Sequence, residues 1–133
     1  MKNDQEYLLN NREKFNKELL DFIAIPSIAA LPEHSKDVQR AASWLEKKLL
    51  DVGVENVEVM KTGGQPAVYG DWMHAGNDKP TVLIYGHFDV QPVDPVELWE
   101  HDPFTPTIKD EKIFARGASD DKGSMFIPII VFE

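Results

Sequence analysis

The chain has 133 residues, of which 42% are hydrophobic and 28% charged, and its formal net charge is −9. This length suits one domain, and the acidic balance argues against nucleic acid or an anionic membrane as a partner, because both attract basic surfaces. The absence of cysteine excludes disulfides, thiolate metal sites and a cysteine nucleophile. The polar N-terminus is unlike a secretory signal, and no apolar run approaches the ~20 residues of a membrane span, so we expect a cytoplasmic protein.

Two amphipathic helices are predicted in the first half of the chain. From Asp4 to Ile23 the apolar residues recur at spacings that place them on one helix face, and Pro26 ends the pattern. A second helix is predicted from Ser35 to Val52, with Gly53 as its left-handed C-terminal cap. The inner face of this second helix consists of Val38, Ala41, Ala42, Leu45 and Leu49.

The second half has the pattern of strands. The segment "ENVEVMK" alternates, "PAVYGDW" is rich in β-formers, and "PTVLIYG" is an apolar run typical of a strand covered on both faces. Between Val90 and Thr107 the prolines exclude regular structure, but Trp99 and Phe104 predict an ordered loop that they anchor, with the lining of a substrate pocket as the alternative. "KIFARG" predicts another strand and "SMFIPIIVFE" an apolar helix. The expected fold class is therefore α/β, with a mixed sheet flanked by helices.

The last predicted helix reaches Glu133 without a residue that usually closes a helix, such as glycine, asparagine or proline. We therefore expect the chain to be a piece of a longer protein and the fold to be incomplete.

The first chemical motif is "VLIYGHFDVQP", in which a predicted core strand leads into Gly86, His87 and Asp89. Residues two apart in extended backbone project to the same face, so the imidazole and the carboxylate are expected to emerge together. A metal-binding histidine usually donates its second ring N–H to an oxygen, which Asp89 is placed to supply. The alternative is that both side chains only cap backbone groups at the end of the strand.

The second motif is "ARGASDDKGSM", which lies between a predicted strand and a predicted helix. Asp120 follows His87 by 33 residues, enough for the chain to return to the same edge of the sheet. One imidazole and one carboxylate suit zinc, manganese or cobalt better than calcium. The pair Ser119 and Lys122 also fits S-x-x-K, a nucleophilic serine with a lysine partner, but two fixed letters are a weak signal. We expect three other histidines to be solvated, namely His34, His74 and His101.

Together, "GHFDVQPVDP…LWEHDPFTP…DEKIFARGASDDKG" closely resembles the dinuclear zinc metallopeptidase family of carnosinase-like dipeptidases, aminoacylase, carboxypeptidase G and succinyl-diaminopimelate desuccinylase. The match runs from about Thr81 to Gly123, and the residues of its motifs are most similar to those of the carnosinase-like dipeptidases. The resemblance implies a zinc-exopeptidase-like catalytic domain, two Zn²⁺ ions per complete site (with Mn²⁺ or Co²⁺ as alternatives), a small peptide as substrate, and a homodimeric longer protein.

The resemblance also assigns roles to individual residues. His87 resembles a histidine ligand of one metal ion, Asp89 the catalytic-site aspartate that steadies this histidine, and Asp120 the carboxylate that bridges two metal ions. The peptide bond after the bridging aspartate is typically cis in the family. Asp121 to Gly123 are then expected to shape the turn and not to bind metal.

The family's general base is a glutamate in a Glu-Glu pair that follows the bridging aspartate, and no such pair occurs here. Glu133 is the one acid after Asp121. We therefore expect residues 1–133 to be the N-terminal part of a metallopeptidase catalytic domain, without the rest of that domain and without a lid or dimerisation domain. The longer protein is expected to hydrolyse dipeptides or short peptides, while the chain alone binds zinc weakly and is inactive. The alternatives are an N-acyl amino-acid deacylase or desuccinylase, and a non-catalytic remnant that binds a partner.

Overall fold

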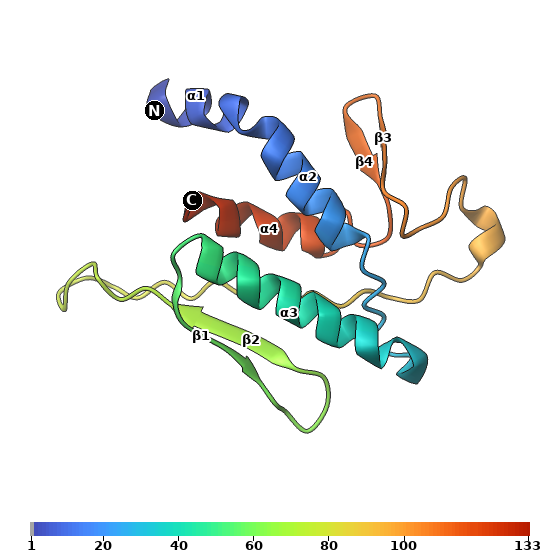
Figure 1. Ribbon diagram of the computed structural model, residues 1–133, viewed down its shortest axis with the longest axis horizontal. Helices are drawn as coiled ribbons and strands as arrows, with labels where there is room; N and C mark the ends of the chain where they lie inside the picture. The colour runs from blue at the N-terminus through green and yellow to red at the C-terminus, as the bar shows by residue number, and fades with distance from the viewer. Residues whose placement is uncertain (1) are drawn as a thin grey trace.

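The computed structural model describes residues 2–133. Its helices and strands, in chain order, are α1 Lys2–Asn10, α2 Arg12–Ile23, η1 Pro32–His34, α3 Ser35–Asp51, β1 Glu55–Met60, β2 Ala67–Asp71, η2 Val96–Leu98, β3 Thr107–Lys109, β4 Lys112–Phe114 and α4 Lys122–Val131 (Figure 1). None of the helices in this described part has the length and apolar character that a membrane crossing requires.

The first predicted helix is two helices, and the break lies at Asn11. This residue leaves the helical region, with φ −104° and ψ 6°, and its side chain donates to the Tyr7 carbonyl at 2.9 Å. Asparagine weakens helices in this way because its side chain competes for backbone hydrogen bonds. The helix predicted from residue 35 is confirmed as α3, and Gly53 beyond it has the expected left-handed φ of 87°.

The core forms where α2, α3 and α4 pack together. In Figure 1, α3 lies between the β1–β2 hairpin and the pair formed by α2 and α4. Phe22 is fully buried, and its ring stacks on Trp44 with centroids 4.4 Å apart. The predicted inner face of α3 is confirmed, with four of its residues buried: Val38, Ala41, Ala42 and Leu45.

The strands form two separate antiparallel hairpins, β1 with β2 and β3 with β4. Asp110 and Glu111 join β3 to β4, and both have positive φ, 50° and 59°, as a two-residue turn of type I′ requires. The α/β class is confirmed, although no mixed sheet is assembled from the strands within residues 2–133.

The prediction of a buried strand at "PTVLIYG" is wrong. Residues 81–85 are extended but pair with no other strand among the described residues, and Leu83 and Tyr85 are 88% and 87% exposed. An apolar run indicates a strand that could be buried, but hydrogen-bonded neighbours must be supplied from elsewhere in the sequence. The neighbours that would cover this segment are absent from the part of the chain that the structure describes.

Candidate metal-binding site

The structure brings the two sequence motifs into contact. His87 lies at the end of the extended segment, and Asp120 lies in the turn before α4. The His87 Nε2 atom is 3.1 Å from Asp120 Oδ1, although the residues are 33 positions apart. Both side chains reach solvent, with 42% of His87 and 82% of Asp120 exposed, so the pair is accessible to a ligand.

Asp89 holds the opposite edge of the His87 ring. His87 Nδ1 is 3.1 Å from Asp89 Oδ1 and 3.2 Å from the Asp89 carbonyl oxygen. Both of these oxygens accept hydrogen bonds, so Nδ1 must carry the proton and donate it. A neutral His87 then presents an unprotonated Nε2 toward Asp120.

The contact between Nε2 and Asp120 therefore joins two acceptors unless a cation lies between them. A proton on Nε2 is one solution. Burial alone would lower the pKa of His87, but the carbonyl and carboxylate of Asp89, the Asp120 carboxylate and the nearby charge of Asp121 together raise this pKa above its ordinary value. A divalent metal ion is the other solution, because it accepts the lone pairs of both atoms.

The donor set of this pair fits a divalent metal in part. Two atoms bound to one zinc ion at its usual distances of about 2.0–2.2 Å lie roughly 3.3 Å apart in a tetrahedral site, close to the observed 3.1 Å. Zinc sites usually have three or four protein ligands. Among residues 2–133 no group of three or more histidine, aspartate or glutamate side chains is arranged to hold a metal. The described residues thus bring together two groups of a kind that zinc binds, fewer than a complete site requires.

The turn that carries Asp120 is tied to the first motif by its neighbour. The backbone N–H of His87 donates to Asp121 Oδ2 at 3.0 Å, so Asp121 links the two motifs. The peptide bond between Asp120 and Asp121 is cis, as the family resemblance implied. Gly86 permits the close approach, because a Cβ at this position would lie 2.7 Å from Met125 Cβ and 3.0 Å from Asp121 Oδ2.

The S-x-x-K interpretation of the acidic turn is not supported by the geometry. Lys122 Nζ donates to the carbonyls of Phe22 and Ile25, so the amine is occupied away from Ser119 and does not activate this serine. Glu133 is bound by the ammonium groups of Lys14 and Lys48, which places it in a structural ion-pair cluster.

Of the three histidines predicted to be solvated, His74 and His101 are exposed and His34 is half-buried, and two of them also contact a carboxylate. His34 Nδ1 lies 3.0 Å from a carboxylate oxygen of Asp37, and His74 Nε2 lies 2.8 Å from one of Glu55. Each is therefore engaged with a local carboxylate.

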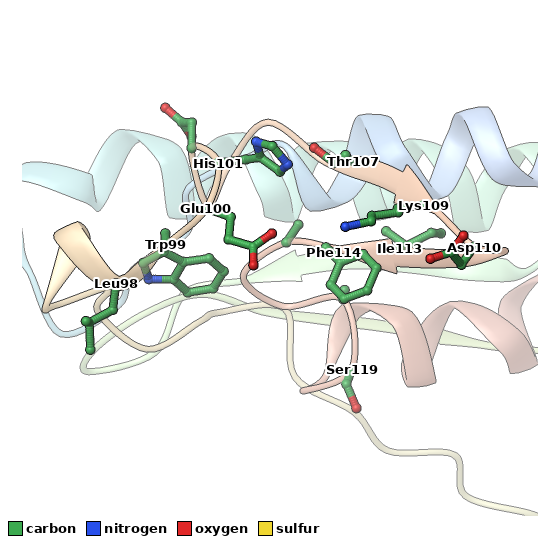
Figure 2. Close-up of a pocket in the computed structure, with 13 residues that line it drawn as sticks. Leu98, Trp99, Glu100, His101, Thr107, Lys109, Asp110, Ile113, Phe114 and Ser119 are labelled. Carbon is green, nitrogen blue, oxygen red and sulfur yellow. The ribbon is translucent and has the colours of Figure 1, made fainter.

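A pocket adjoins the turn that carries Asp120, because Ser119 forms part of its wall (Figure 2). The pocket has a volume of about 490 Å³ and lies between the Trp99 loop and the β3–β4 hairpin. Trp99 lines the pocket, whereas Phe104, which was the other residue expected to anchor the loop or line a pocket, does not. Figure 2 shows the Glu100 carboxylate directed toward the space between the Trp99 and Phe114 rings. Sequence reasoning missed Glu100, because only the folding of the loop against the hairpin brings it there.

Trp99 itself is the predicted anchor of the proline-rich loop. Its indole N–H donates to the Val93 carbonyl at 2.9 Å, and the Arg116 guanidinium lies 5.2 Å from its ring centroid. These contacts confirm that the loop is ordered against the body.

Comparisons with known proteins point to one family. Residues 83–133 match the model described as peptidase family M20/M25/M40. A cysteinylglycine-S-conjugate dipeptidase of Corynebacterium striatum is 32% identical over 120 residues, covering 90% of this chain and 26% of that protein. A succinyl-diaminopimelate desuccinylase of Bordetella avium is 36% identical over 113 residues, covering 85% of this chain and 27% of that protein.

The fold gives the same result. The crystal structure of an M20 family metallo-carboxypeptidase from Sulfolobus solfataricus is similar with a TM-score of 0.80 at 38% identity, covering 89% of this chain and 26% of that one. The chain thus spans about a quarter of the length of the relatives that it matches. By sequence and by fold, the chain is similar to M20 metallopeptidases, which confirms the resemblance carried by its two motifs.

Proposed function

We propose that the chain is the N-terminal part of a metal-dependent peptidase that hydrolyses the peptide bond of dipeptides or short peptides. The observation that carries the proposal is the pairing of His87 Nε2 with Asp120 Oδ1 at 3.1 Å, with Asp89 on the other ring nitrogen. The names of the relatives support the peptidase class, since they include a dipeptidase and a metallo-carboxypeptidase.

In this proposal His87 and Asp120 are metal ligands and Asp89 orients the imidazole. Zn²⁺ is the proposed ion, with Mn²⁺ or Co²⁺ as alternatives, and when bound it acidifies a water molecule and polarises the scissile carbonyl. Asp89 keeps the Nδ1 proton in place, so that Nε2 stays free to bind. The Asp120 side chain is 82% exposed, so its carboxylate would be accessible to a metal ion. The other ligands and the general base are supplied by sequence outside residues 1–133, because this chain corresponds to about a quarter of its relatives.

The test uses the longer protein with a panel of dipeptides. Turnover is expected with Zn²⁺, loss of turnover with a chelator, and recovery when the metal is restored. His87→Ala and Asp120→Ala should each abolish activity, whereas His74→Ala, which removes a histidine paired with Glu55 outside the site, should leave it unchanged. Activity that survives both site substitutions would overturn the metal assignment.

A second candidate is the removal of an acyl group from an amino acid, because the desuccinylase relative is 36% identical over 85% of this chain. Both reactions break an amide bond, which is the bond that the proposed metal would activate, so the two motifs do not distinguish them. A panel that includes N-succinyl and N-acetyl amino acids separates the two. A protein that binds zinc and peptides without turning over any of these compounds would be a non-catalytic binding module. A homodimeric longer protein and a cytoplasmic location stay predictions from the sequence.

A further inference from the structure

The two halves of the candidate site rest on one short segment of backbone, residues 22–28, which we call the anchoring segment. It contains the last two residues of α2, Phe22 and Ile23, and the bend that follows. The bend is closed by short backbone hydrogen bonds, from the N–H of Ser27 to the Ile25 carbonyl and from that of Ile28 to the Pro26 carbonyl, both at 2.8 Å. Phe22 and Ser27 are fully buried, so the segment lies largely inside the fold.

Ser27 attaches the first motif to the anchoring segment. Its hydroxyl donates to the Phe88 carbonyl at 2.6 Å, and its own carbonyl accepts the Val90 N–H at 2.9 Å. Residues 88 and 90 flank Asp89, and residue 88 directly follows His87. The bonds from one buried serine therefore fix the backbone that carries both the imidazole and its orienting carboxylate.

Lys122 attaches the second motif to the same anchoring segment. Its side chain is fully buried, and Nζ donates to the Ile25 carbonyl at 2.7 Å and to the Phe22 carbonyl at 3.0 Å. The ammonium also lies 4.9 Å from the centroid of the Phe22 ring. Because Lys122 is two residues after Asp120, these bonds set where the acidic turn stands relative to α2.

Side-chain packing joins the two attachments. Phe22 and Ile25 form a core cluster with Ala41, and Phe88 from the first motif and Met125 from the second pack against it. Both motifs thus contact the anchoring segment through hydrogen bonds and through apolar packing. Burying a lysine amine is unfavourable unless its donors are satisfied, which here requires the acidic turn to sit against the anchoring segment.

We propose that Ser27 and Lys122 are positioning residues, which hold His87 and Asp120 at metal-binding distance by fastening both motifs to residues 22–28. Neither side chain touches the metal position; each acts through the backbone. The proposal rests on the proposed function for its link to metal, but the placement of His87 can be tested in the metal-free chain.

The experiment compares Ser27→Ala and Lys122→Met with a matched control, Lys48→Met. Lys48 is also a buried lysine, 6% exposed, but it lies on α3 and bonds to Glu18 and Glu133. The first measurement is hydrogen exchange of the His87 amide, which donates to Asp121, relative to amides in the middle of α3. Ser27→Ala and Lys122→Met should speed exchange at His87 by about tenfold or more beyond any change in α3, and Lys48→Met should change both equally.

The second measurement is a titration with Zn²⁺ alone, followed by the His87 imidazole NMR signals. Loss of groups that orient a metal ligand typically lowers affinity by 10- to 100-fold, and this loss is expected for Ser27→Ala and Lys122→Met but not for Lys48→Met. Lys122→Arg, which keeps a cation and N–H donors, should recover part of the affinity.

The inference is overturned if His87 exchange follows α3 in both site variants, or if Lys48→Met reproduces their effects. If Lys122→Met does not fold, Ser27→Ala, which removes a single oxygen, decides the question. If neither the unaltered chain nor the longer protein shows a Zn²⁺-dependent change at His87, the metal assignment fails, while the exchange measurement still decides whether the anchoring segment positions the motifs.

Discussion

Gly123→Ala should destabilise the protein, although alanine normally favours a helix. Gly123 lies in the first turn of α4, where helix propensity alone predicts a gain of about 1 kcal/mol. A Cβ at this position, however, would lie 1.9 Å from the Ala118 carbonyl oxygen, whereas carbon and oxygen in close contact are ordinarily about 3.3 Å apart. The backbone of the acidic turn would therefore have to move by roughly 1.4 Å.

The size of the effect follows from this displacement. Overpacking typically costs about 1–3 kcal/mol, and because the obstacle is backbone we take the upper value. After the helix gain is subtracted, the net loss is about 2 kcal/mol, or a Tm lower by roughly 6–10 °C for a chain of this size. The assay is thermal or urea unfolding followed by circular dichroism.

Gly63→Ala is the matched control. Nothing lies within 4 Å of a Cβ added at Gly63, so this change should be neutral or stabilising by up to about 1 kcal/mol. Displacement of the turn should also weaken Zn²⁺ binding in Gly123→Ala. A Gly123→Ala protein as stable as the unaltered chain would show that the turn and α4 are not held as closely as described.

Three further perturbations test the packing and the charges. Phe22→Ala should lower the free energy of unfolding by about 3–5 kcal/mol, measured in urea, because the fully buried ring stacks on Trp44; Leu50→Ala, at an exposed position, is the control. Burial lowers the pKa of Lys122 to about 7 from 10.5, so between these values the unfolded chain binds a proton that the folded chain does not. The free energy of unfolding should therefore rise with pH in this range, by at most about 1.4 kcal/mol per pH unit. This slope should be absent in Lys122→Met, and an identical slope in both proteins would contradict the lowered pKa of Lys122. The His87 imidazole should titrate above its ordinary pKa, and Asp89→Asn should lower the NMR midpoint by removing a carboxylate that favours the charged ring; an unchanged midpoint would argue against the Asp89 contact.

The helices and motifs were accessible from the sequence because their signals are local. The apolar spacing of α3 and the glycine after it are contained within about twenty residues, and both are confirmed. The meeting of "GHFD" with "SDDK" could be anticipated from their positions at the ends of secondary-structure elements. The distance between Nε2 and Oδ1 could not, because it depends on contacts across the fold.

Failures of prediction arose where partners are distant in sequence. The segment containing Leu83 has the composition of a buried strand, but composition does not supply neighbouring strands. The roles of Ser27 and Lys122 were equally hidden, because Lys122 bonds to a carbonyl 97 residues earlier. In the sequence Ser27 is an ordinary serine after a proline, and only the folded chain shows its burial.

The extended segment at residues 81–85 has a practical consequence for work with this chain in solution. Four successive apolar side chains, Val82 to Tyr85, are between 54% and 88% exposed, next to backbone groups that no strand within residues 2–133 pairs with. Such an edge is a template for intermolecular strand pairing. The chain prepared by itself should therefore self-associate as its concentration rises, and a lysine at the outward-facing position 83 would be the simplest way to keep it monomeric.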